Sequence, residues 1–297
     1  MANQAGHLLA PDSSPAEEAG LELALYVVAT PLGNLSDLSA RAVDTLSRVA
    51  CIGAEDTRTS STLLAAHGIK ASLFAAHDHN EDGAAARVLA LLAEGKSVAL
   101  ISDAGTPAIS DPGARIVRAV LEAGRRVIPI PGPSAVVCAL SAAGFEGGFR
   151  FHGFLPAKSG ARRARLRELR YAPETQVLYE APHRIVELAE DLAAELEGTR
   201  KVVIGRELTK RFETVHATEV ALLPEWLAGD SNRQRGEFVV VLEGSGTSAN
   251  NDAENDRVLA LLLTELPVRS AARLAAAITG ASRNALYQRA LALKDPQ

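Results

Sequence analysis

The sequence predicts an α/β protein with two α/β domains and a small helical tail that is helix-turn-helix-like. Three observations support this fold class. From Leu23 to about Ala143, β-branched runs alternate with stretches of helical periodicity, as in a mostly parallel sheet with helices on both faces. A glycine- and arginine-rich segment from Gly144 to Arg170 then breaks the alternation, and further strands follow it. Beyond a polar stretch that begins at Gly244, the pattern is helical only.

We therefore expect five segments. They are a flexible tail over residues 1–22, a parallel α/β domain over 23–143, a second α/β domain over 144–243, a linker over 244–256 and a helical tail over 257–297. In the first domain, Asp111 and Pro112 are expected to open a helix as N-cap and first helical residue. In the second, strands are expected at 176–180, 201–205 and 237–242, with a helix near 185–196.

The composition excludes several classes of protein. A chain of 297 residues with 47% hydrophobic content can bury substantial cores, so it is not disordered as a whole. Its net charge of −5 means that nucleic-acid contact has to come from local basic patches. No apolar stretch is long enough to span a membrane, the first twenty or so residues are expected to be a flexible tail rather than a signal peptide, and the histidines form no metal-ligand pattern. Cys51 and Cys138 lie in apolar elements and are expected to be buried and reduced, as in a cytoplasmic protein.

Three strand ends in the first domain have a composition that suits ligand binding. The loops that follow these strands are Thr30 to Asn34, Ser102 to Pro107 and Pro131 to Ala135. Glycine and proline fix tight turns and let a ligand approach the backbone, and open α/β sheets bind ligands at the carboxyl ends of their strands. One such loop alone is more simply a connection, but three indicate a crevice. The fingerprints of Rossmann dehydrogenases and P-loop NTPases are missing from the sequence.

The segment Glu55-Asp56-Thr57-Arg58 follows another strand of the same sheet and is a candidate for the acceptor side of a reaction. It joins two acids to an arginine that can bind phosphate. Glu55, Asp56 and Arg58 are therefore our candidate catalytic residues. The alternative stays open that Asp56 only caps the next helix and that Arg58 is solvated.

Basic residues interleaved with aromatic ones indicate contact with RNA. Between Phe149 and Arg170, seven arginines and lysines stand against Glu168 alone, with three phenylalanines among them. Such a mixture suits phosphate contact and base stacking, although a solvated helix face above core phenylalanines would look the same. The expected RNA-binding residues are Lys158, Arg162, Arg163, Arg184, Lys210 and Arg283.

The helical tail carries a separate basic signal. Helices expected at 270–278 and 282–293 are joined by a short turn that contains a glycine, and basic residues such as Arg283 predominate after Pro267. Two helices with such a turn match the outline of a helix-turn-helix. A solvated helical hairpin that packs on its neighbour is the alternative. Lys210 and Arg206, near a strand end, either bind phosphate or pair with Glu207.

Six motifs together resemble one family closely. They are Thr30 to Asn34, Glu55 to Arg58, Ser102 to Pro107, Pro131 to Ala135, Tyr179 to Arg184 and Gly205 to Lys210. The chain resembles, from Leu23 to its C-terminus, the bacterial small-subunit rRNA cytidine 2′-O-methyltransferases of the tetrapyrrole-methylase-like, class III family, which use S-adenosylmethionine. This resemblance implies two α/β domains with S-adenosylmethionine in the cleft between them, and a homodimer. The donor-binding residues that it implies are Pro31, Gly33, Asp103, Ala104, Gly105, Pro107, Gly132, Ser134, Ala135, Tyr179 and Glu180.

The expected reaction is transfer of a methyl group to the 2′-hydroxyl of a cytidine in 16S rRNA of the small ribosomal subunit, at rRNA position 1402 by the resemblance. Most of the acceleration should come from holding oxygen and methyl carbon in a near-attack geometry, and a general base adds roughly 10²–10⁴-fold. The candidates for that base, which the sequence does not rank, are Glu55, Asp56, Asp103, Glu180 and Glu207.

Three other functions stay open. A methylase of tetrapyrrole precursors usually carries a G-x-G-P-G-D-type loop where this chain has Thr30-Pro31-Leu32-Gly33-Asn34, and it would leave the basic segment and the helical tail unexplained. The other two are an assembly factor that binds RNA without turnover and a protein methylase.

Overall fold

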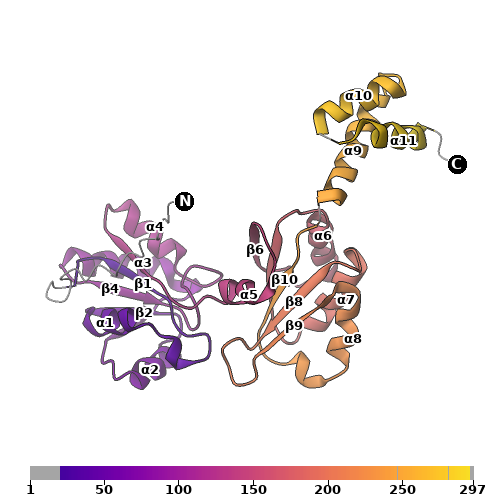
Figure 1. Cartoon of the computed structure of the whole chain (residues 1–297). Coiled ribbons are helices and arrows are strands. Elements are labelled where there is room, and N and C mark those ends of the chain that lie inside the picture. The colour runs from indigo at the N-terminus through magenta and orange to yellow at the C-terminus, as the bar shows by residue number, and fades with distance from the viewer. Residues whose placement is uncertain (1–20, 246, 280, 295–297) are drawn as a thin grey trace, which may run out of the picture. The chain divides into compact units, whose positions relative to one another are not determined.

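The computed structural model describes residues 21–245, 247–279 and 281–294 (Figure 1). The chain divides into two compact units, Met1–Pro133 and Ser134–Gln297. We expected the boundary after Ala143, but helix α5 (Ala135–Ala143) belongs to the second unit. The physical reason is its apolar face, because Val136 and Ala139 are buried in one cluster with Val177, Val203 and Val241 of the second sheet.

The first unit is built on a five-stranded, fully parallel sheet, whereas the sequence predicted a mostly parallel one and did not reveal the short strand β3 (Leu73–Ala75). Its strands are β1 (Leu25–Val28), β2 (Cys51–Ala54), β3 (Leu73–Ala75), β4 (Val98–Ile101) and β5 (Val127–Ile130), in the order β3-β2-β4-β1-β5. Its helices are α1 (Ala40–Arg48), α2 (Thr57–Ala66), α3 (Glu81–Ala93) and α4 (Ala114–Glu122), with 3₁₀ turns η1 (Leu35–Asp37) and η2 (Asp78–Asn80). All four residues of β2 and of β4 are buried, because both faces of the sheet are covered by helices.

The helices divide between the two faces of this sheet. Leu46 of α1 and Leu64 of α2 belong to one buried cluster, whereas Leu92 of α3 and Ile116 of α4 belong to another. The chain leaves β1 toward β2 but leaves β4 toward β5, although β1 and β4 are neighbours. The loops after these two strands therefore diverge, and this is the topological switch point at which open α/β sheets bind ligands.

Helix α4 begins later than its sequence suggested. Its N-cap is Gly113 at φ 131°, and the expected cap, Asp111, lies in the preceding loop. The cap prediction is wrong because tertiary contacts fix the start of the helix. Gly113 N–H donates to Glu81 Oε1 at 2.6 Å, and a Cβ at this position would meet Leu100 Cδ2 at 2.8 Å.

The second unit contains a mixed five-stranded sheet. Its strands are β6 (Phe149–Phe154), β7 (Thr175–Glu180), β8 (Lys201–Arg206), β9 (Thr214–Glu219) and β10 (Phe238–Leu242), in the order β6-β7-β10-β8-β9. Only the β6–β7 pair is parallel. The three expected strands are confirmed as β7, β8 and β10, whereas the edge strands β6 and β9 were not predicted. Both edge strands carry exposed side chains, so their hydrophobic pattern is weak.

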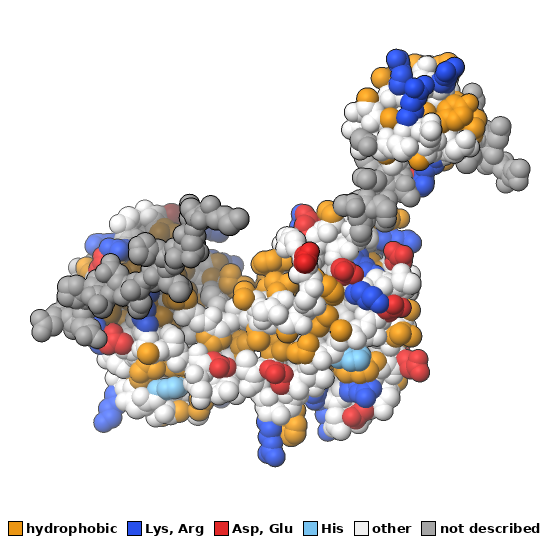
Figure 2. Space-filling model, in the orientation of Figure 1, with side chains coloured by type: hydrophobic (Ala, Val, Ile, Leu, Met, Phe, Trp, Pro, Cys, Tyr) orange, Lys and Arg blue, Asp and Glu red, His pale blue; other side chains and the backbone are white. Residues whose placement is uncertain are grey.

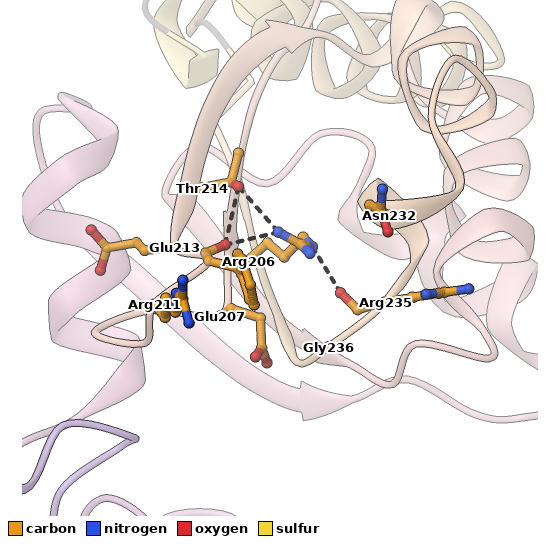
Figure 3. A pocket seen from close by; sticks show the side chains of 9 residues that line it. Arg206, Glu207, Arg211, Glu213, Thr214, Asn232, Arg235 and Gly236 are labelled. Carbon is orange, nitrogen blue, oxygen red and sulfur yellow. Dashed lines mark hydrogen bonds between the residues drawn. The ribbon is translucent and has the colours of Figure 1, made fainter.

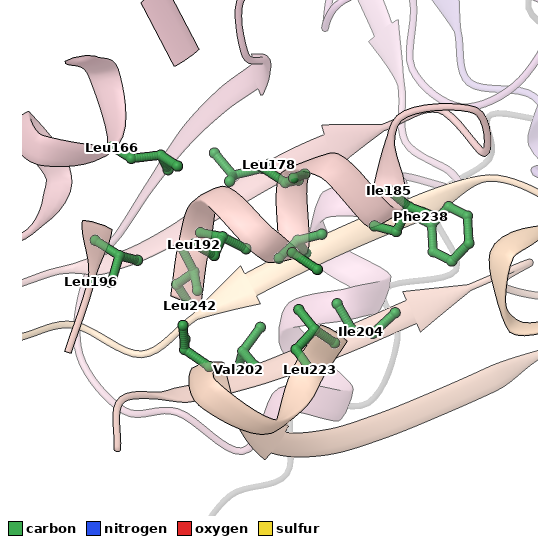
Figure 4. Close-up of a cluster of buried hydrophobic side chains, with 14 of the residues drawn as sticks. Leu166, Leu178, Ile185, Leu192, Leu196, Val202, Ile204, Leu223, Phe238 and Leu242 are labelled. Atoms are coloured by element: carbon green, nitrogen blue, oxygen red, sulfur yellow. The ribbon is translucent and has the colours of Figure 1, made fainter. Parts of the chain in front are cut away.

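Helices cover both faces of this second sheet. Helices α6 (Ser159–Leu169), α7 (Ile185–Glu195) and α8 (Leu223–Ala228) pack on one face through Leu166, Leu192 and Leu223 (Figure 4). Helix α5 packs on the other face. The 3₁₀ turns η3 (Val220–Leu222) and η4 (Ser231–Gln234) flank α8.

The C-terminal part consists of α9 (Thr247–Leu263), α10 (Val268–Thr279) and α11 (Arg283–Lys294). The last two confirm the expected helices. The expected linker over 244–256 is wrong for most of its length, since α9 runs through it. Leu259 is fully buried in a cluster with Ala275, Leu286 and Ala290, and Asp256 pairs with Arg289. The helix is therefore stabilised by residues that follow the polar stretch.

Two smaller expectations are also tested. Cys51 is buried as expected, but Cys138 is only half-buried, and both are free thiols. None of the described helices is both long enough and apolar enough to cross a membrane. Of the expected tail over 1–22, only residues 21 and 22 fall within the described part of the chain.

Candidate active site

The loops after β1 and β4 are bonded to each other at the switch point. Thr30 N–H donates to Gly105 O at 2.8 Å, and Gly105 N–H donates to Thr30 O at 3.0 Å. The buried Thr30 hydroxyl also donates to Ser102 O at 3.0 Å. Two loops that lie far apart in the sequence are thus held together by hydrogen bonds at one edge of the sheet. We call this part, around Thr30 and Gly105, the bonded edge.

The loop after β5 joins the same edge. Thr106 Oγ1 donates to Pro133 O at 3.0 Å, and a Cβ on Gly132 would come within 3.0 Å of Ala29 Cβ. The structure therefore joins the three loops that carry the expected donor-site residues of the first unit, and donor contact stays a prediction for Pro31, Gly33, Asp103, Ala104, Gly105, Pro107 and Gly132. Ser134 and Ala135 lie at the start of α5, in the second unit.

Acidic side chains gather beside this edge. Glu55 Oε2 accepts a hydrogen bond from Asp103 N–H at 3.3 Å, and Asp103 Oδ1 accepts one from Asp56 N–H at 3.1 Å. Burial, reinforced by the charge of Asp103, raises the pKa of Glu55. Burial together with the charge of Glu55 raises the pKa of Asp111 to about 6. Sequence reasoning missed Asp111 as a site residue, because we assigned it to a helix cap.

Asp56 and Arg58 adopt the arrangement that we considered as the alternative. Asp56 is the N-cap of α2, where its Oδ1 accepts from Arg58 N–H at 2.8 Å. The hydrogen bond from the Arg58 guanidinium lowers the pKa of Asp56 to about 2. Asp56 is therefore a weak base, whereas the Arg58 side chain is 90% exposed and phosphate contact at Arg58 stays a prediction.

The residues of this edge fit S-adenosylmethionine. The donor carries two positive charges, on its sulfonium and its ammonium group, and the acids Glu55, Asp103 and Asp111 complement them. Gly105 has φ +84°, and a Cβ there would meet nothing closer than Leu32 Cδ2 at 3.4 Å. Because glycine has no side chain, a ligand can approach the backbone closely at this position.

In the second unit, Tyr179 and Glu180 end strand β7. Glu180 is 2% exposed, and its Oε1 accepts from Ala181 N–H at 2.9 Å and lies 3.1 Å from Arg184 Nε. Burial raises the pKa of Glu180, and within the described residues its Oε2 has no hydrogen-bond partner. Tyr179 is fixed by edge-to-face contacts with Phe151 and Phe154, with ring centroids 4.8 and 5.7 Å away. Donor contact at both residues stays a prediction.

The structure corrects part of the expected RNA surface. Arg162 is 1% exposed, and its guanidinium donates to Asp191 at 2.6 Å and to Glu187 at 3.1 Å. Arg184 donates to Leu155 O at 2.7 Å and is largely buried. Arg162 therefore holds the second unit together from its interior, which speaks against RNA contact there, whereas RNA contact at the partly exposed Arg184 stays a prediction.

The remaining basic residues fall into two groups. Arg163 pairs with Glu195 at 2.7 Å, and Lys210 pairs with Glu207 and Glu237 at 2.9 and 2.8 Å. Lys158 and Arg283 are exposed and remain candidates for RNA contact. A signal for the pairing was present in the sequence, since Glu187, Asp191 and Glu195 recur every fourth residue and so form an acidic stripe on one helix face.

Two family models and several related sequences match this chain. Residues 24–224 match the family model described as Tetrapyrrole (Corrin/Porphyrin) Methylases, and residues 249–294 match the RsmI C-terminal HTH domain. The chain is 49% identical to ribosomal RNA small subunit methyltransferase I of Escherichia coli O157:H7, over 90% of this chain and 94% of the relative. It is 50% identical to the protein of that name from Pseudomonas aeruginosa, over 90% and 96% of the two chains.

Solved structures share the fold at lower identity. The uroporphyrin-III-C-methyltransferase from Thermus thermophilus superposes with a TM-score of 0.54 at 20% identity, over 75% of this chain and 94% of that one. A cobalt precorrin-4 methyltransferase gives 0.56 at 18% identity, over 74% and 95%. The family model spans more than half of the chain, and the relatives named for ribosomal RNA are about half identical over nearly their whole length. The chain therefore belongs to the tetrapyrrole methylase family, in the group of ribosomal RNA small subunit methyltransferase I.

Proposed function

We propose that this protein transfers a methyl group from S-adenosylmethionine to the 2′-oxygen of a cytidine ribose in 16S rRNA of the small ribosomal subunit. The identity to relatives named for small-subunit ribosomal RNA supports the substrate. The observation that carries the chemistry is the bonded edge formed by Thr30, Gly105 and Pro133 at the switch point, with the exposed Asp103 beside it.

S-adenosylmethionine supplies an electrophilic methyl group on a positively charged sulfur. The loops of the first unit bind and orient it through backbone groups, and Asp103 with Glu55 offsets its positive charge. The hydrogen bonds between these loops hold the edge in one geometry before substrate arrives. Such positioning is the main source of acceleration for a transfer that needs little direct chemistry at sulfur. Tyr179 and Glu180 of the second unit complete the donor site in this proposal.

Glu55 is the best placed general base among the five acids considered. Asp56 is a weak base with a pKa of about 2. Glu180 is buried beside Arg184, and Glu207 is bonded to Lys210 and to Glu237 N–H. Glu55 is half-exposed, and burial raises its pKa above the usual range of a glutamate, which makes it a stronger base than Asp56. Asp103 serves in positioning, because one of its oxygens accepts from Asp56 N–H.

The exposed Arg58, Lys158 and Arg283 supply phosphate contacts in this proposal, and the protein acts as a homodimer in the cytoplasm. The test is incubation with labelled S-adenosylmethionine and small subunits that lack ribose methylation, with free 16S rRNA in parallel. Nuclease digestion and mass spectrometry then locate the label. We expect label on one cytidine ribose. Label on protein, or donor binding without label on RNA, would contradict the proposal.

A matched pair of variants separates catalysis from binding. Asp103→Ala removes the acid at the bonded edge and should abolish methyl transfer while RNA binding is largely retained. Asp82→Ala, at an exposed acid on α3 of the same unit, should leave both unchanged. A protein that only binds RNA would show no transfer to lose, even in its wild-type form.

A further inference from the structure

We infer that the second unit carries an additional RNA contact, a pocket that takes a phosphate and an unstacked base of single-stranded RNA. The inference rests on the proposed function, since it extends the substrate surface of the same enzyme. The pocket has a volume of about 640 Å³ and lies between the β8–β9 connection and the loop before β10 (Figure 3). Residues of its wall that matter here are Arg206, Arg211, Phe212, Thr214, Arg235 and Gly236.

Arg206 forms a rigid, positively charged centre of this pocket. Its Nε donates to Arg235 O at 2.7 Å, and its Nη1 donates to Phe212 O at 2.8 Å and to Thr214 Oγ1 at 3.2 Å. One guanidinium therefore ties both loops together (Figure 3). Its partners are neutral oxygens, and no carboxylate pairs with it in the described part of the chain, so its charge stays available to a phosphate.

The acids of the wall are occupied by other partners. Glu213 Oε2 accepts from Thr209 N–H at 2.6 Å. Glu207 Oε1 accepts from Glu237 N–H and from Lys210 Nζ, each at 2.9 Å. Burial raises the pKa of Glu207, but these two hydrogen bonds, together with the charges of Lys210 and Arg206, outweigh it and lower the pKa. The carboxylates of the wall therefore hold the two loops in place and form no ion pairs with Arg211 or Arg235 within the residues that the structure describes.

The rim presents two arginines and one aromatic ring to solvent. Arg211 and Arg235 are exposed, and among the described residues neither forms an ion pair with a carboxylate. Figure 3 shows their side chains on opposite sides of Arg206. Phe212 is 66% exposed, with the Arg211 guanidinium 5.5 Å from its ring centre. Basic and hydrophobic side chains protrude together where Figure 1 places the β8–β9 connection (Figure 2).

This combination suits single-stranded RNA better than an acidic peptide. A phosphate binds to guanidinium groups, and an exposed ring offers a base a stacking surface that is independent of sequence. An acidic peptide would use the arginines but not the ring.

The backbone of the pocket is held in unusual conformations. Glu207 and Thr209 have φ of 50° and 66°, in the left-handed region that side chains other than glycine rarely adopt. Gly236 has φ 89°, and a Cβ there would collide with the side chain of Glu207. Strained backbone of this kind is concentrated at ligand sites, where it holds loops in a binding conformation. The strain and the Arg206 bonds together give a preformed site.

The test uses the full-length protein and a fluorescein-labelled single-stranded RNA oligonucleotide. The double variant R211Q/R235Q should weaken the Kd for this RNA about tenfold and make the slope of log K against log salt shallower by about 1.4, since two phosphate contacts to a single strand are lost. Phe212→Ala should weaken RNA binding several-fold without a change in that slope, whereas Phe212→Trp keeps an aromatic ring and should bind RNA as tightly as the wild type. The matched controls are Arg118→Gln on α4 and Leu222→Ala in η3, which remove an exposed arginine and an exposed hydrophobic side chain elsewhere.

Methylation of small subunits gives the second readout. The pocket variants should raise KM for the subunit and leave kcat and the affinity for S-adenosylhomocysteine unchanged, because they lie outside the donor edge. Wild-type RNA affinity and KM in these variants would overturn the pocket inference and leave the proposed function standing. The pocket inference would also be overturned if these variants lost affinity for an acidic peptide but kept their affinity for RNA. If the wild-type protein methylates no RNA, the proposed function fails, and oligonucleotide binding alone decides the inference. Circular dichroism melting checks that each variant folds.

Discussion

Glu55 and Asp103 hold the carboxyl ends of β2 and β4 together through reciprocal contacts. Glu55 accepts a hydrogen bond from the backbone of Asp103 at 3.3 Å, and Asp103 accepts one from the backbone of Asp56 at 3.1 Å. Each carboxylate thus fixes the loop that carries the other. The loop with Gly105 is therefore positioned from two sides, by β1 through Thr30 and by β2 through Glu55.

Substitutions of Glu55 separate positioning from proton transfer. Glu55→Gln keeps an oxygen that can accept from Asp103 N–H, so donor affinity should stay within about threefold of wild type while kcat falls roughly 10²-fold or more. Glu55→Ala removes the hydrogen bond as well and should weaken donor binding in addition. Isothermal titration with S-adenosylhomocysteine and single-turnover methylation measure the two effects. Full kcat in Glu55→Gln would remove Glu55 from the role of base.

The raised pKa of Asp111 predicts a pH dependence of stability. Burial and the charge of Glu55 raise this pKa from 3.8 to about 6 in the folded state, so the folded protein binds a proton more tightly than the unfolded chain. The contribution of Asp111 to the free energy of unfolding is therefore most favourable below pH 4, and it falls as the pH rises to about 6. Asp111→Asn stays neutral and should be more stable than wild type by on the order of 1 kcal/mol at pH 8, after allowance for solvent screening.

Urea unfolding at pH 4.5, 6 and 8 measures this effect. Asp82→Asn, at an exposed acid of the same unit, is the control and should follow the wild-type profile. If Asp111→Asn shows no gain at pH 8 relative to pH 4.5, the carboxyl of Asp111 does not titrate as described.

Much of the first unit was predictable because its signals are local. Strands such as Val98–Ile101 are short apolar runs that end at glycine or proline, and a buried parallel strand requires that pattern. The loops after β1, β4 and β5 could therefore be assigned to one sheet edge. The bonds between them, such as that from Thr106 to Pro133, join residues far apart in sequence and carry no local pattern.

The predictions that were wrong failed because contacts between residues far apart in the sequence leave no local pattern. Arg162 has the same side chain as the exposed Arg167, and only the packing of α6 on α7 buries one and exposes the other. The start of α4 is fixed by Glu81, which lies more than a full strand and loop earlier in the chain. The polar stretch before Asn255 is helical because of the apolar residues that follow it, such as Leu259. In each case a distant contact overrides the local preference.

The buried Arg162 should matter for stability and not directly for RNA. Arg162→Ala leaves Asp191 buried without its main partner and should destabilise the protein by about 3 kcal/mol. The double substitution Arg162→Met with Asp191→Leu should recover much of that loss, because an apolar pair can replace a buried ion pair. Lys158→Ala, on the exposed side, should weaken RNA binding without lowering the melting temperature. Selective loss of RNA affinity in a fully stable Arg162 variant would restore Arg162 to the RNA surface.

Gly105 and Gly68 provide a matched pair for the donor site. Both have positive φ, +84° and +69°, and a Cβ at Gly68 would meet nothing within 4 Å. Alanine at either position should therefore cost about 1 kcal/mol of stability from backbone strain alone. Only Gly105→Ala should also weaken the binding of S-adenosylhomocysteine, by about tenfold or more, because its methyl group would stand where a donor approaches the backbone of the loop after β4. Thermal unfolding and calorimetric titration of both variants make the comparison. Equal donor affinity in the two variants would show that the ligand does not lie against Gly105, and the donor would then have to bind at another part of the sheet edge.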